Sequence, residues 1–339
     1  MIKFFTISIF LNYKKEVLFM KRLTFLLVIV LIFSFFLTSV ALAKYPVKPV
    51  KIIVAFKAGG GTDTAARVIA KFAKKYFPKS FVIVNKPGAG GQIGFEALAF
   101  SKPDGYTIGF INTPHIISHY VSGKAKYKIS DFKPICNVVT DPGVLAIRAD
   151  EKRFSTLKGL VTYAKLHPGE LSAATTGPGG DDSIALLLFM KQAGINIKDV
   201  PFSGSSGEKA ALLGKHVDFA MVNVSQVLSL AKEGKVKMVA VMADKRLKAL
   251  PDIPTFKELG YNVISDSSRG IAAPAGVSDE IINQLKEVFA KVIEDPDFIA
   301  QAKKSGLYII LNYMDSEQFS QYLKDLQERV EELYKENPW

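Results

Sequence analysis

The sequence predicts an α/β protein with two similar lobes, and three observations lead to this prediction. Short β-branched runs alternate with amphipathic helical patterns, which is typical of a parallel sheet covered by helices. The alternation occurs twice, and the second series begins after Asp141-Pro142. A glycine-rich turn follows a strand in both series. The chain beyond residue 43, about 296 residues, is also long enough for two lobes.

The N-terminus carries an export signal. The basic pair Lys21-Arg22 precedes an apolar stretch from Leu23 to Val40 and then the small-x-small sequence Ala41-Leu42-Ala43. This order predicts a signal peptide over residues 1–43, cleaved after Ala43. An uncleaved anchor is the alternative, because 18 apolar-rich residues can span a bilayer.

The start of the chain allows two interpretations. Met20 stands directly before the basic pair, so residues 1–19 are either an extension from an upstream start codon or an unusually long amino-terminal region. No cysteine occurs in the first 43 residues, so we expect a soluble periplasmic product rather than a lipoprotein. The single cysteine, Cys136, excludes an internal disulfide and lies in an apolar stretch, which predicts an inert core thiol.

The charge pattern indicates a solvated surface rather than a nucleic-acid module. The first 43 residues contribute +4 of the net charge of +12, which leaves +8 for the mature protein. Lysines are scattered over predicted helix faces and are not clustered with aromatic residues, so they predict a solvated surface. A positive mean field favours the approach of an anion.

The predicted strands fall into the two series. The first comprises residues 52–56, 81–85 and 107–111, and the second comprises 144–147, 171–175, 199–202, 218–222 and 236–241, with helices between them.

The last third of the chain is predicted to be mostly helical. We expect Ser278 to cap one helix, and Asp315 with Gln318 to form a capping box for the last one. Apolar residues from Phe319 to Tyr334 recur on one face of that last helix. This face is predicted to dock onto the first lobe; a coiled-coil partner is the alternative.

The most informative feature is the junction Gly59-Gly60-Gly61-Thr62-Asp63 at the end of the first strand. Backbone amides in such a loop and at the start of the next helix can bind an anion. A plain turn with Thr62 or Asp63 as N-cap is the alternative. Comparable loops run from Thr175 to Ser183 and from Phe202 to Ser206. Together they predict a cleft for a small polar anion, with no metal or cofactor.

Other chemistries fit the sequence poorly. The run Gly88 to Gly94 resembles a dinucleotide fingerprint but lacks the acidic residue that binds a ribose. Ser205-Ser206 are not in a nucleophile elbow, and His115 and His119 lack the glutamate of a zinc-protease helix. Asp181-Asp182 are adjacent, so on a helix they point about 100° apart and cannot share a proton.

Six runs of residues occur in a specific order along the chain. They are Tyr45-Pro46 with Lys48-Pro49, Gly59 to Asp63 with Ala66-Arg67, Asn85 to Gly91 with Gly94, Pro103 to Thr107, Pro201 to Gly204, and Leu250 to Thr255 with Glu258 and Gly260. In this order the chain resembles the extracytoplasmic solute receptors of the tripartite tricarboxylate transporter family, also called Bug receptors. The resemblance covers essentially all of Tyr45 to the C-terminal helix.

The resemblance implies a type II periplasmic-binding-protein fold, in which two α/β lobes are joined by two crossover strands and close over a ligand cleft like a Venus flytrap. It places residues 44–145 and 268–339 in the first lobe and 146–267 in the second. It implies a monomer that delivers a small carboxylate to the membrane subunits of a transporter. The ligand-binding residues carried over by position are Ala58, Gly59, Gly60, Thr62, Asp63, Gly88, Ala89, Gly90, Thr176, Gly177, Gly179, Ser183, Ser203 and Gly204, and Asp181 and Arg269 complete the set.

The chain departs from the family pattern at three places. Lys57-Ala58 replaces a proline and puts an extra cation near the mouth. Asp181-Asp182 replaces a small residue and a histidine, which disfavours a multiply charged acid or favours a ligand with an amine. Ser267-Ser268-Arg269 replaces a tryptophan, so Arg269 either contacts a distal carboxylate or forms a salt bridge. Three roles are open for Asp63. It caps its helix, it bridges to the ligand through a water molecule, or it contacts an amine of the ligand; we expect capping.

The sequence therefore predicts a carboxylate receptor for a secondary transporter and not an enzyme. A ligand-sensing protein for signalling is one alternative. An exported hydrolase that uses Ser203 or Ser206 is the other, but His167 and His216 stand in no recognisable motif for a catalytic base.

Overall fold

The computed structural model describes residues 17, 20–27, 29, 45–305 and 307–339. Residues 1–47 form a unit of their own, in which residues 20–27 are helical. The predicted cleavage position after Ala43 lies outside the described residues. Within the described part of the chain, no helix has both the length and the hydropathy needed to cross a bilayer.

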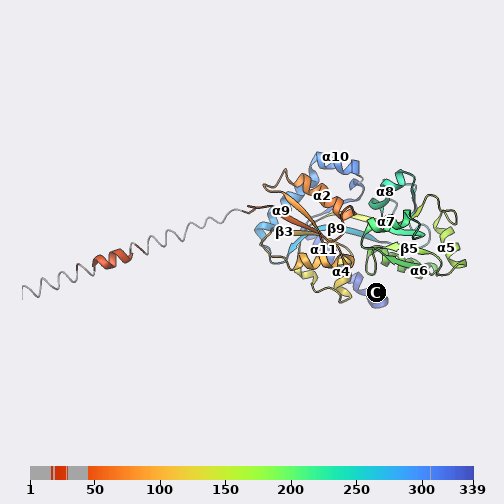
Figure 1. Ribbon diagram of the computed structural model, residues 1–339, viewed down its shortest axis with the longest axis horizontal. Helices are drawn as coiled ribbons and strands as arrows, with labels where there is room; N and C mark the ends of the chain where they lie inside the picture. Colours follow the sequence, from red (N-terminus) through yellow and green to blue (C-terminus); the bar gives the residue numbers. More distant parts are fainter. Residues whose placement is uncertain (1–16, 18–19, 28, 30–44, 306) are drawn as a thin grey trace, which may run out of the picture. The chain divides into compact units, whose positions relative to one another are not determined.

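Residues 48–339 are organised around a mixed sheet (Figure 1). Its strand order is β2-β1-β3-β9-β4-β7-β5-β6, and β8 and β10 also pair with β4. The strands are β1 Val50–Val54, β2 Phe81–Asn85, β3 Thr107–Asn112, β4 Phe132–Arg148, β5 Ser172–Thr175, β6 Lys198–Pro201, β7 Phe219–Asn223, β8 Val236–Val241, β9 Asp266–Pro274 and β10 Leu311–Met314.

Helices connect most of these strands. They are α2 Gly61–Ala73, α3 Gln92–Ala99, α4 His115–Val121, α5 Leu157–Leu166, α6 Asp181–Ala193, α7 Ser205–Leu213, α8 Val224–Lys232, α9 Asp279–Glu294, α10 Pro296–Ser305 and α11 Ser316–Glu336, with short 3-10 turns η1 Ala89–Gly91, η2 Ile129–Asp131 and η3 Leu307–Ile310. Each strand predicted from the sequence coincides with, or overlaps, an observed one.

Two parallel halves are joined by two long strands. In the first half β1 pairs in parallel with β2 and β3, and in the second half β5 pairs in parallel with β6 and β7. The strands β4 and β9 are antiparallel to each other and lie between the halves. From Phe132 to Pro142, β4 pairs with β9, and from Gly143 to Arg148 it pairs with β7 and β8. The predicted fold of two α/β lobes with two crossover strands is confirmed.

Helices cover both faces of each half. In the second half, α5 and α6 share one apolar core with β4, and α7 and α8 share another on the opposite face. In the first half, α2 packs against α9 and α10, where the rings of Phe72 and Phe298 lie 5.8 Å apart. The opposite face packs on α3, α4 and α11. Each strand end is thereby fixed between two helical layers.

The last helix docks as predicted. Phe319, Leu323 and Val330 are buried in the core of the first half. Asp315 and Gln318 form the predicted capping box at the start of α11. Ser278 is the N-cap residue of α9, although its side chain makes no capping hydrogen bond.

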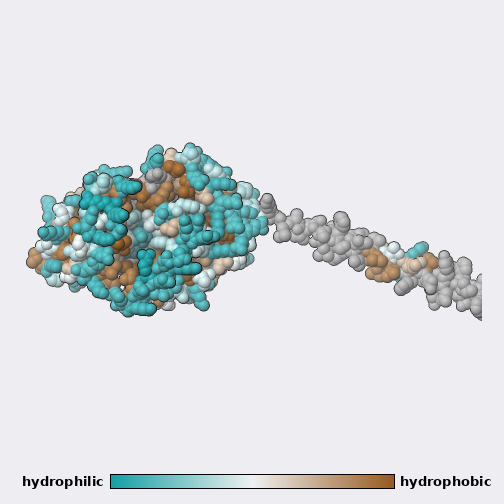
Figure 2. Space-filling view, turned by 180° about the vertical axis from the view of Figure 1, so that it is seen from behind, coloured by the Kyte–Doolittle hydropathy of each residue, from teal (hydrophilic) through white to brown (hydrophobic). Residues whose placement is uncertain are grey.

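The surface is mainly polar. Figure 2 shows one face, on which hydrophilic residues cover most of the area and apolar residues appear in separate patches. Large apolar side chains that are exposed are far apart in the sequence, such as Phe100 directly after α3 and Leu166 at the end of α5. This pattern agrees with the solvated surface expected from the sequence.

Candidate functional site

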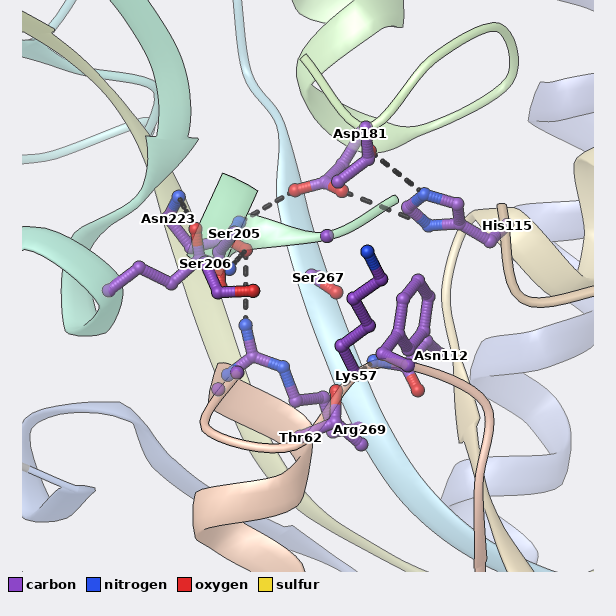
Figure 3. Close-up of a pocket in the computed structure, with 16 residues that line it drawn as sticks. Lys57, Thr62, Asn112, His115, Asp181, Ser205, Ser206, Asn223, Ser267 and Arg269 are labelled. Carbon is purple, nitrogen blue, oxygen red and sulfur yellow. Dashed lines mark hydrogen bonds and ion pairs between the residues drawn. The ribbon is translucent and has the colours of Figure 1, made fainter. Parts of the chain in front are cut away.

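A cavity of about 30 Å3 lies where the carboxyl ends of β1, β3, β5, β6 and β7 approach one another (Figure 3). This is the edge at which open α/β sheets bind ligands. The residues that line it are Phe56, Lys57, Gly60, Gly61, Thr62, Asn112, His115, Thr176, Asp181, Gly204, Ser205, Ser206, Asn223, Gln226, Ser267 and Arg269. We call it the primary cavity.

Four helices point their N-termini at the primary cavity. The helix α2 begins at Gly61, α6 at Asp181 and α7 at Ser205, while Asn223 is the N-cap of α8. The first turns of a helix leave backbone N–H groups without intrahelical partners and carry the positive end of the helix dipole. The cavity is therefore suited to a small anion.

A chain of polar contacts crosses the cavity from one half to the other. Arg269 Nη1 lies 2.9 Å from Asp141 Oδ2, and both side chains are buried. Arg269 Nη2 donates to Asn223 Oδ1 at 3.0 Å, and Asn223 Nδ2 donates to Asp181 Oδ2 at 2.6 Å. Arg269 Nη1 makes no aligned hydrogen bond within the described residues, so it keeps a donor for a ligand.

The Arg269 guanidinium lies against the start of α2. A Cβ atom at Gly61 would stand 3.2 Å from Arg269 Cζ, so glycine is the residue that leaves room for this contact. A cation beside the positive end of a helix is electrostatically unfavourable. An anion placed between the two relieves this repulsion.

Thr62 presents a hydroxyl to the cavity. Its Oγ1 accepts a hydrogen bond from Asn112 Nδ2 at 2.7 Å, so its proton remains available for a ligand oxygen. Asn112 Oδ1 has no partner among the described residues.

The tautomer of His115 follows from its neighbours. Thr176 Oγ1 donates to Asp182 Oδ1 at 2.6 Å, so it must accept from His115 Nε2, which lies 3.0 Å away. His115 Nδ1 is then an unprotonated acceptor, and it has no hydrogen-bond partner within the described chain. Burial lowers the pKa of His115 to about 3, so the ring is neutral at physiological pH.

The two adjacent aspartates have different surroundings. Asp181 lines the cavity, and burial raises its pKa to about 6 although Asn223 and Arg269 favour its ionised form. Asp182 turns toward the backbone N–H of Thr176, which lies 2.8 Å away. Burial and the nearby charge of Asp181 raise the pKa of Asp182 well above its usual range. The two carboxyl groups diverge as the sequence predicted.

Lys57 supplies the cation expected at the mouth. It is an exposed residue that lines the cavity, and Figure 3 shows its side chain extended toward Asp181 and His115.

The structure brings part of the predicted set together in the primary cavity. These residues are Gly60, Thr62, Thr176, Asp181, Gly204 and Arg269. A second cavity of about 340 Å3 shares Thr176 with the first and is lined by four more of the predicted residues, Ala89, Gly90, Gly177 and Ser203.

Asp63 does not line either cavity. Its carboxylate accepts hydrogen bonds from Gly59 N, Arg67 Nε and Asn85 Nδ2 at 2.9 to 3.0 Å. Burial opposes ionisation, but these hydrogen bonds outweigh it and lower the pKa of Asp63. The prediction that Thr62 or Asp63 is the N-cap is wrong, because α2 begins at Gly61 with Gly60 as N-cap. Asp63 lies in the first turn of α2 and instead stabilises the glycine loop by accepting the hydrogen bond from Gly59 N.

The remaining predicted residues also lie outside the two cavities. Ser183 Oγ donates to Asp199 Oδ2 at 2.9 Å. Gly179 packs against Ser118 and Trp339. Ala58 and Gly59 are exposed on the loop, and Gly88 packs against Ile93.

Sequence reasoning missed several residues of the primary cavity. Asn112 and Asn223 are polar residues at the ends of apolar strands, and this position is the signal that could have identified them. His115 was considered only as a metal ligand. Phe56 and Gln226 gave no signal of their own in the sequence, and Ser267 was noted only as part of the run that replaces a tryptophan.

Comparison with known proteins identifies the family. Residues 65–338 match the family described as the tripartite tricarboxylate transporter family receptor. The chain belongs to this family. A UPF0065 protein in the gbd 5' region of Cupriavidus necator is 30% identical over 282 residues, which cover 82% of this chain and 84% of that protein. Protein BugT of Bordetella pertussis is 30% identical over 242 residues, 70% of this chain and 74% of BugT.

Solved structures of similar proteins agree with the family assignment. The periplasmic binding protein BugD is 29% identical with a TM-score of 0.78, and the match covers 86% of this chain and 98% of BugD. MatC from Rhodopseudomonas palustris, solved with bound malate, is 25% identical with a TM-score of 0.78, and the match covers 85% of this chain and 99% of MatC. The primary cavity is therefore the candidate solute site of a transporter-family receptor.

Proposed function

We propose that this protein is an exported receptor that captures a small carboxylate in the primary cavity and delivers it to the membrane subunits of a tripartite tricarboxylate transporter. The observation that carries the proposal is the convergence of four helix N-termini and the buried Arg269 on one cavity. The relative MatC, which was solved with malate, supports a carboxylate as the ligand class.

The available donors are sufficient for useful affinity. Each charge-assisted hydrogen bond contributes about 1.5 to 3 kcal/mol. Four or five of them, after the entropy of association is subtracted, give about −8 kcal/mol, which corresponds to a micromolar Kd. Such an affinity needs no covalent step or bound metal.

Ligand entry requires the two halves to separate. A cavity of about 30 Å3 holds only one or two water-sized groups. We assign residues 44–145 and 268–339 to one lobe and 146–267 to the other, with bending in β4 and β9 near Asp141 and Asp266. The buried hydrogen bond from Arg269 to Asn223 joins the two lobes and then belongs to the closed form, whereas the ion pair of Arg269 with Asp141 lies within one lobe.

The export signal supports a periplasmic location. The proposal includes cleavage after Ala43 and release of a monomer without a lipid anchor. The relative BugD, described as a periplasmic binding protein, supports the compartment.

A hydrolytic function is less well supported. Ser206 lines the cavity, but within the described residues no hydrogen bond joins it to a histidine, and Ser203 lines the second cavity. The His115 ring is bonded to Thr176 instead. We therefore propose binding without turnover.

Calorimetric titration of the protein with mono-, di- and tricarboxylates tests the proposed function. We expect at least one carboxylate to bind with a micromolar Kd and to raise the Tm. Binding of sugars or metal cations with no response to any carboxylate would refute the proposal. Loss of uptake of the same carboxylate in a deletion strain separates transport from sensing.

A further inference from the structure

The primary cavity has two ends of opposite character. One end offers donors, namely Arg269 Nη1 and the amides at the start of α2 and α7. The other end offers acceptors, and it is formed by His115 and Asp181. A simple carboxylate uses only the first end.

The acceptor end has unused hydrogen-bonding capacity. His115 is 3% exposed, and its Nδ1 has no hydrogen-bond partner among the described residues. Asp181 is 4% exposed, and the one hydrogen bond that another described residue donates to its carboxylate comes from Asn223. Leaving buried acceptors without donors is costly, so this end is built to receive a donor.

The two acceptors cannot satisfy each other. His115 Nδ1 lies 4.0 Å from Asp181 Oδ1, which is too far for a direct hydrogen bond even if Asp181 were protonated. An ammonium nitrogen that lies about 2.8 Å from both atoms fits across this gap. It also matches the pair chemically, because an ammonium group has donors and no acceptor.

We propose that the ligand is an amino acid in the chemical sense, a carboxylate that bears a protonated amine, with its ammonium group bound between His115 Nδ1 and Asp181 Oδ1 and its carboxylate bound at Arg269 and the N-termini of α2 and α7. This inference rests on the proposed function and specifies its ligand class.

The charges of the cavity favour such a zwitterion over a multiply charged acid. Arg269 is already paired with Asp141, and the Asp181 carboxylate opposes a second ligand carboxylate. Burial makes the ionised form of Asp181 costly in the empty site and raises its pKa to about 6. A ligand ammonium would stabilise that ionised form.

Lys57 is the competing occupant. Its ammonium group extends toward the same acceptors in Figure 3. If Lys57 filled the acceptor end in the complex, the ligand would need no amine, and carboxylates without one would bind at least as well.

Matched pairs of ligands test the inference in the wild-type protein. Calorimetry compares L-alanine with propionate, L-aspartate with succinate, and γ-aminobutyrate with butyrate. We expect one amino acid to bind at least tenfold more tightly than its partner without the amine. Equal or tighter binding of the partner in every pair overturns the inference and leaves the carboxylate receptor intact. If no member of any pair binds and no other carboxylate binds either, both the inference and the proposed function are refuted.

A pair of variants locates the ammonium site. Asp181→Asn is expected to weaken amino-acid binding about tenfold to a hundredfold and to leave the affinity for the amine-free partner unchanged or higher. Asp295→Asn is the matched control, because Asp295 is equally buried but pairs with Lys75 and lines neither cavity. It is expected to change both affinities by the same factor. A ratio of affinities that is unchanged in Asp181→Asn would show that the amine does not bind there.

Discussion

Arg269 and Asp141 form a buried ion pair of 2.9 Å between the two crossover strands, β9 and β4. Asp141 also accepts hydrogen bonds from Ser225 N and Oγ at the start of α8. The pair thus connects the strands that join the halves with a helix of the second half. The sequence left two roles open for Arg269, and it both forms this salt bridge and lines the cavity.

Replacing Arg269 should destabilise the protein strongly. Arg269→Met leaves the Asp141 carboxylate buried without its charge partner, and we expect a loss of about 3 to 5 kcal/mol in the free energy of unfolding. Urea denaturation measures this loss. The double variant Arg269→Met with Asp141→Asn should recover part of it, and strictly additive losses would show that the two charges do not interact.

Gly61 is expected to control the position of the guanidinium. A Cβ in Gly61→Ala would lie 3.2 Å from Arg269 Cζ and displace it from the start of α2. We expect carboxylate affinity to fall about tenfold while stability changes by less than about 1 kcal/mol, since alanine favours the helix. Titration calorimetry with Thr64→Ala, an exposed change in the same turn, provides the control. An unchanged Kd in Gly61→Ala would exclude this packing from the site.

The parallel strands could be predicted from the sequence because their residues are apolar on both faces. The runs ending at Val54, Asn85 and Asn112 carry this signal. Most of β4 and all of β9 could not be predicted. β4 contains Pro134 and Asp141-Pro142-Gly143, residues that are rare in strands.

The polar crossover segments are stable because their side chains pair with each other. Thr140 Oγ1 lies 2.8 Å from Ser268 Oγ across β4 and β9, in addition to the pairing of Arg269 with Asp141. Because the partners are far apart in the sequence, such pairing produces no local pattern of apolar residues from which the strands could be predicted. The glycine loops had a local signal, whereas the orientation of His115 toward Asp181 depends on how the halves meet.

Cys136 should be inert in the folded protein. It is fully buried, and burial raises the pKa of its thiol. Because only the exposed thiolate reacts with thiol reagents, we expect labelling only as fast as the protein opens or unfolds. The reaction with a chromogenic disulfide, followed with and without concentrated urea, measures this. Rapid labelling of the native protein would contradict the burial of Cys136.

Asp181 should make the stability of the ligand-free protein fall as the pH rises. Its folded pKa is about 6, above the ordinary value of 3.8, because burial opposes ionisation. Its favourable contribution is complete below pH 4 and is lost as the pH rises to about 6. We therefore expect Asp181→Asn to be more stable than the wild type at pH 7, with an advantage that grows between pH 4 and pH 6.

Urea denaturation at several pH values tests this prediction. Arg269, Asp182, Glu208, Asp266 and His115 also face or influence Asp181. Subtracting the free energy of unfolding of the wild type from that of Asp181→Asn at each pH cancels the contributions of titratable groups that behave alike in both proteins. A difference that does not change between pH 4 and 7 would refute the raised pKa.

Thr62→Val should weaken carboxylate binding by about 1 to 2 kcal/mol, because it removes one hydroxyl donor from the cavity. The fold should persist, although Asn112 Nδ2 loses its acceptor at 2.7 Å and stability falls by about 1 kcal/mol. Thr62→Ser is the matched control, since it keeps the hydroxyl and should retain most of the affinity. Calorimetry gives the Kd of each variant and denaturation gives its stability. If the Thr62→Val and Thr62→Ser variants bind the ligand with the same Kd, the Thr62 hydroxyl only accepts the hydrogen bond from Asn112 and does not contact the carboxylate.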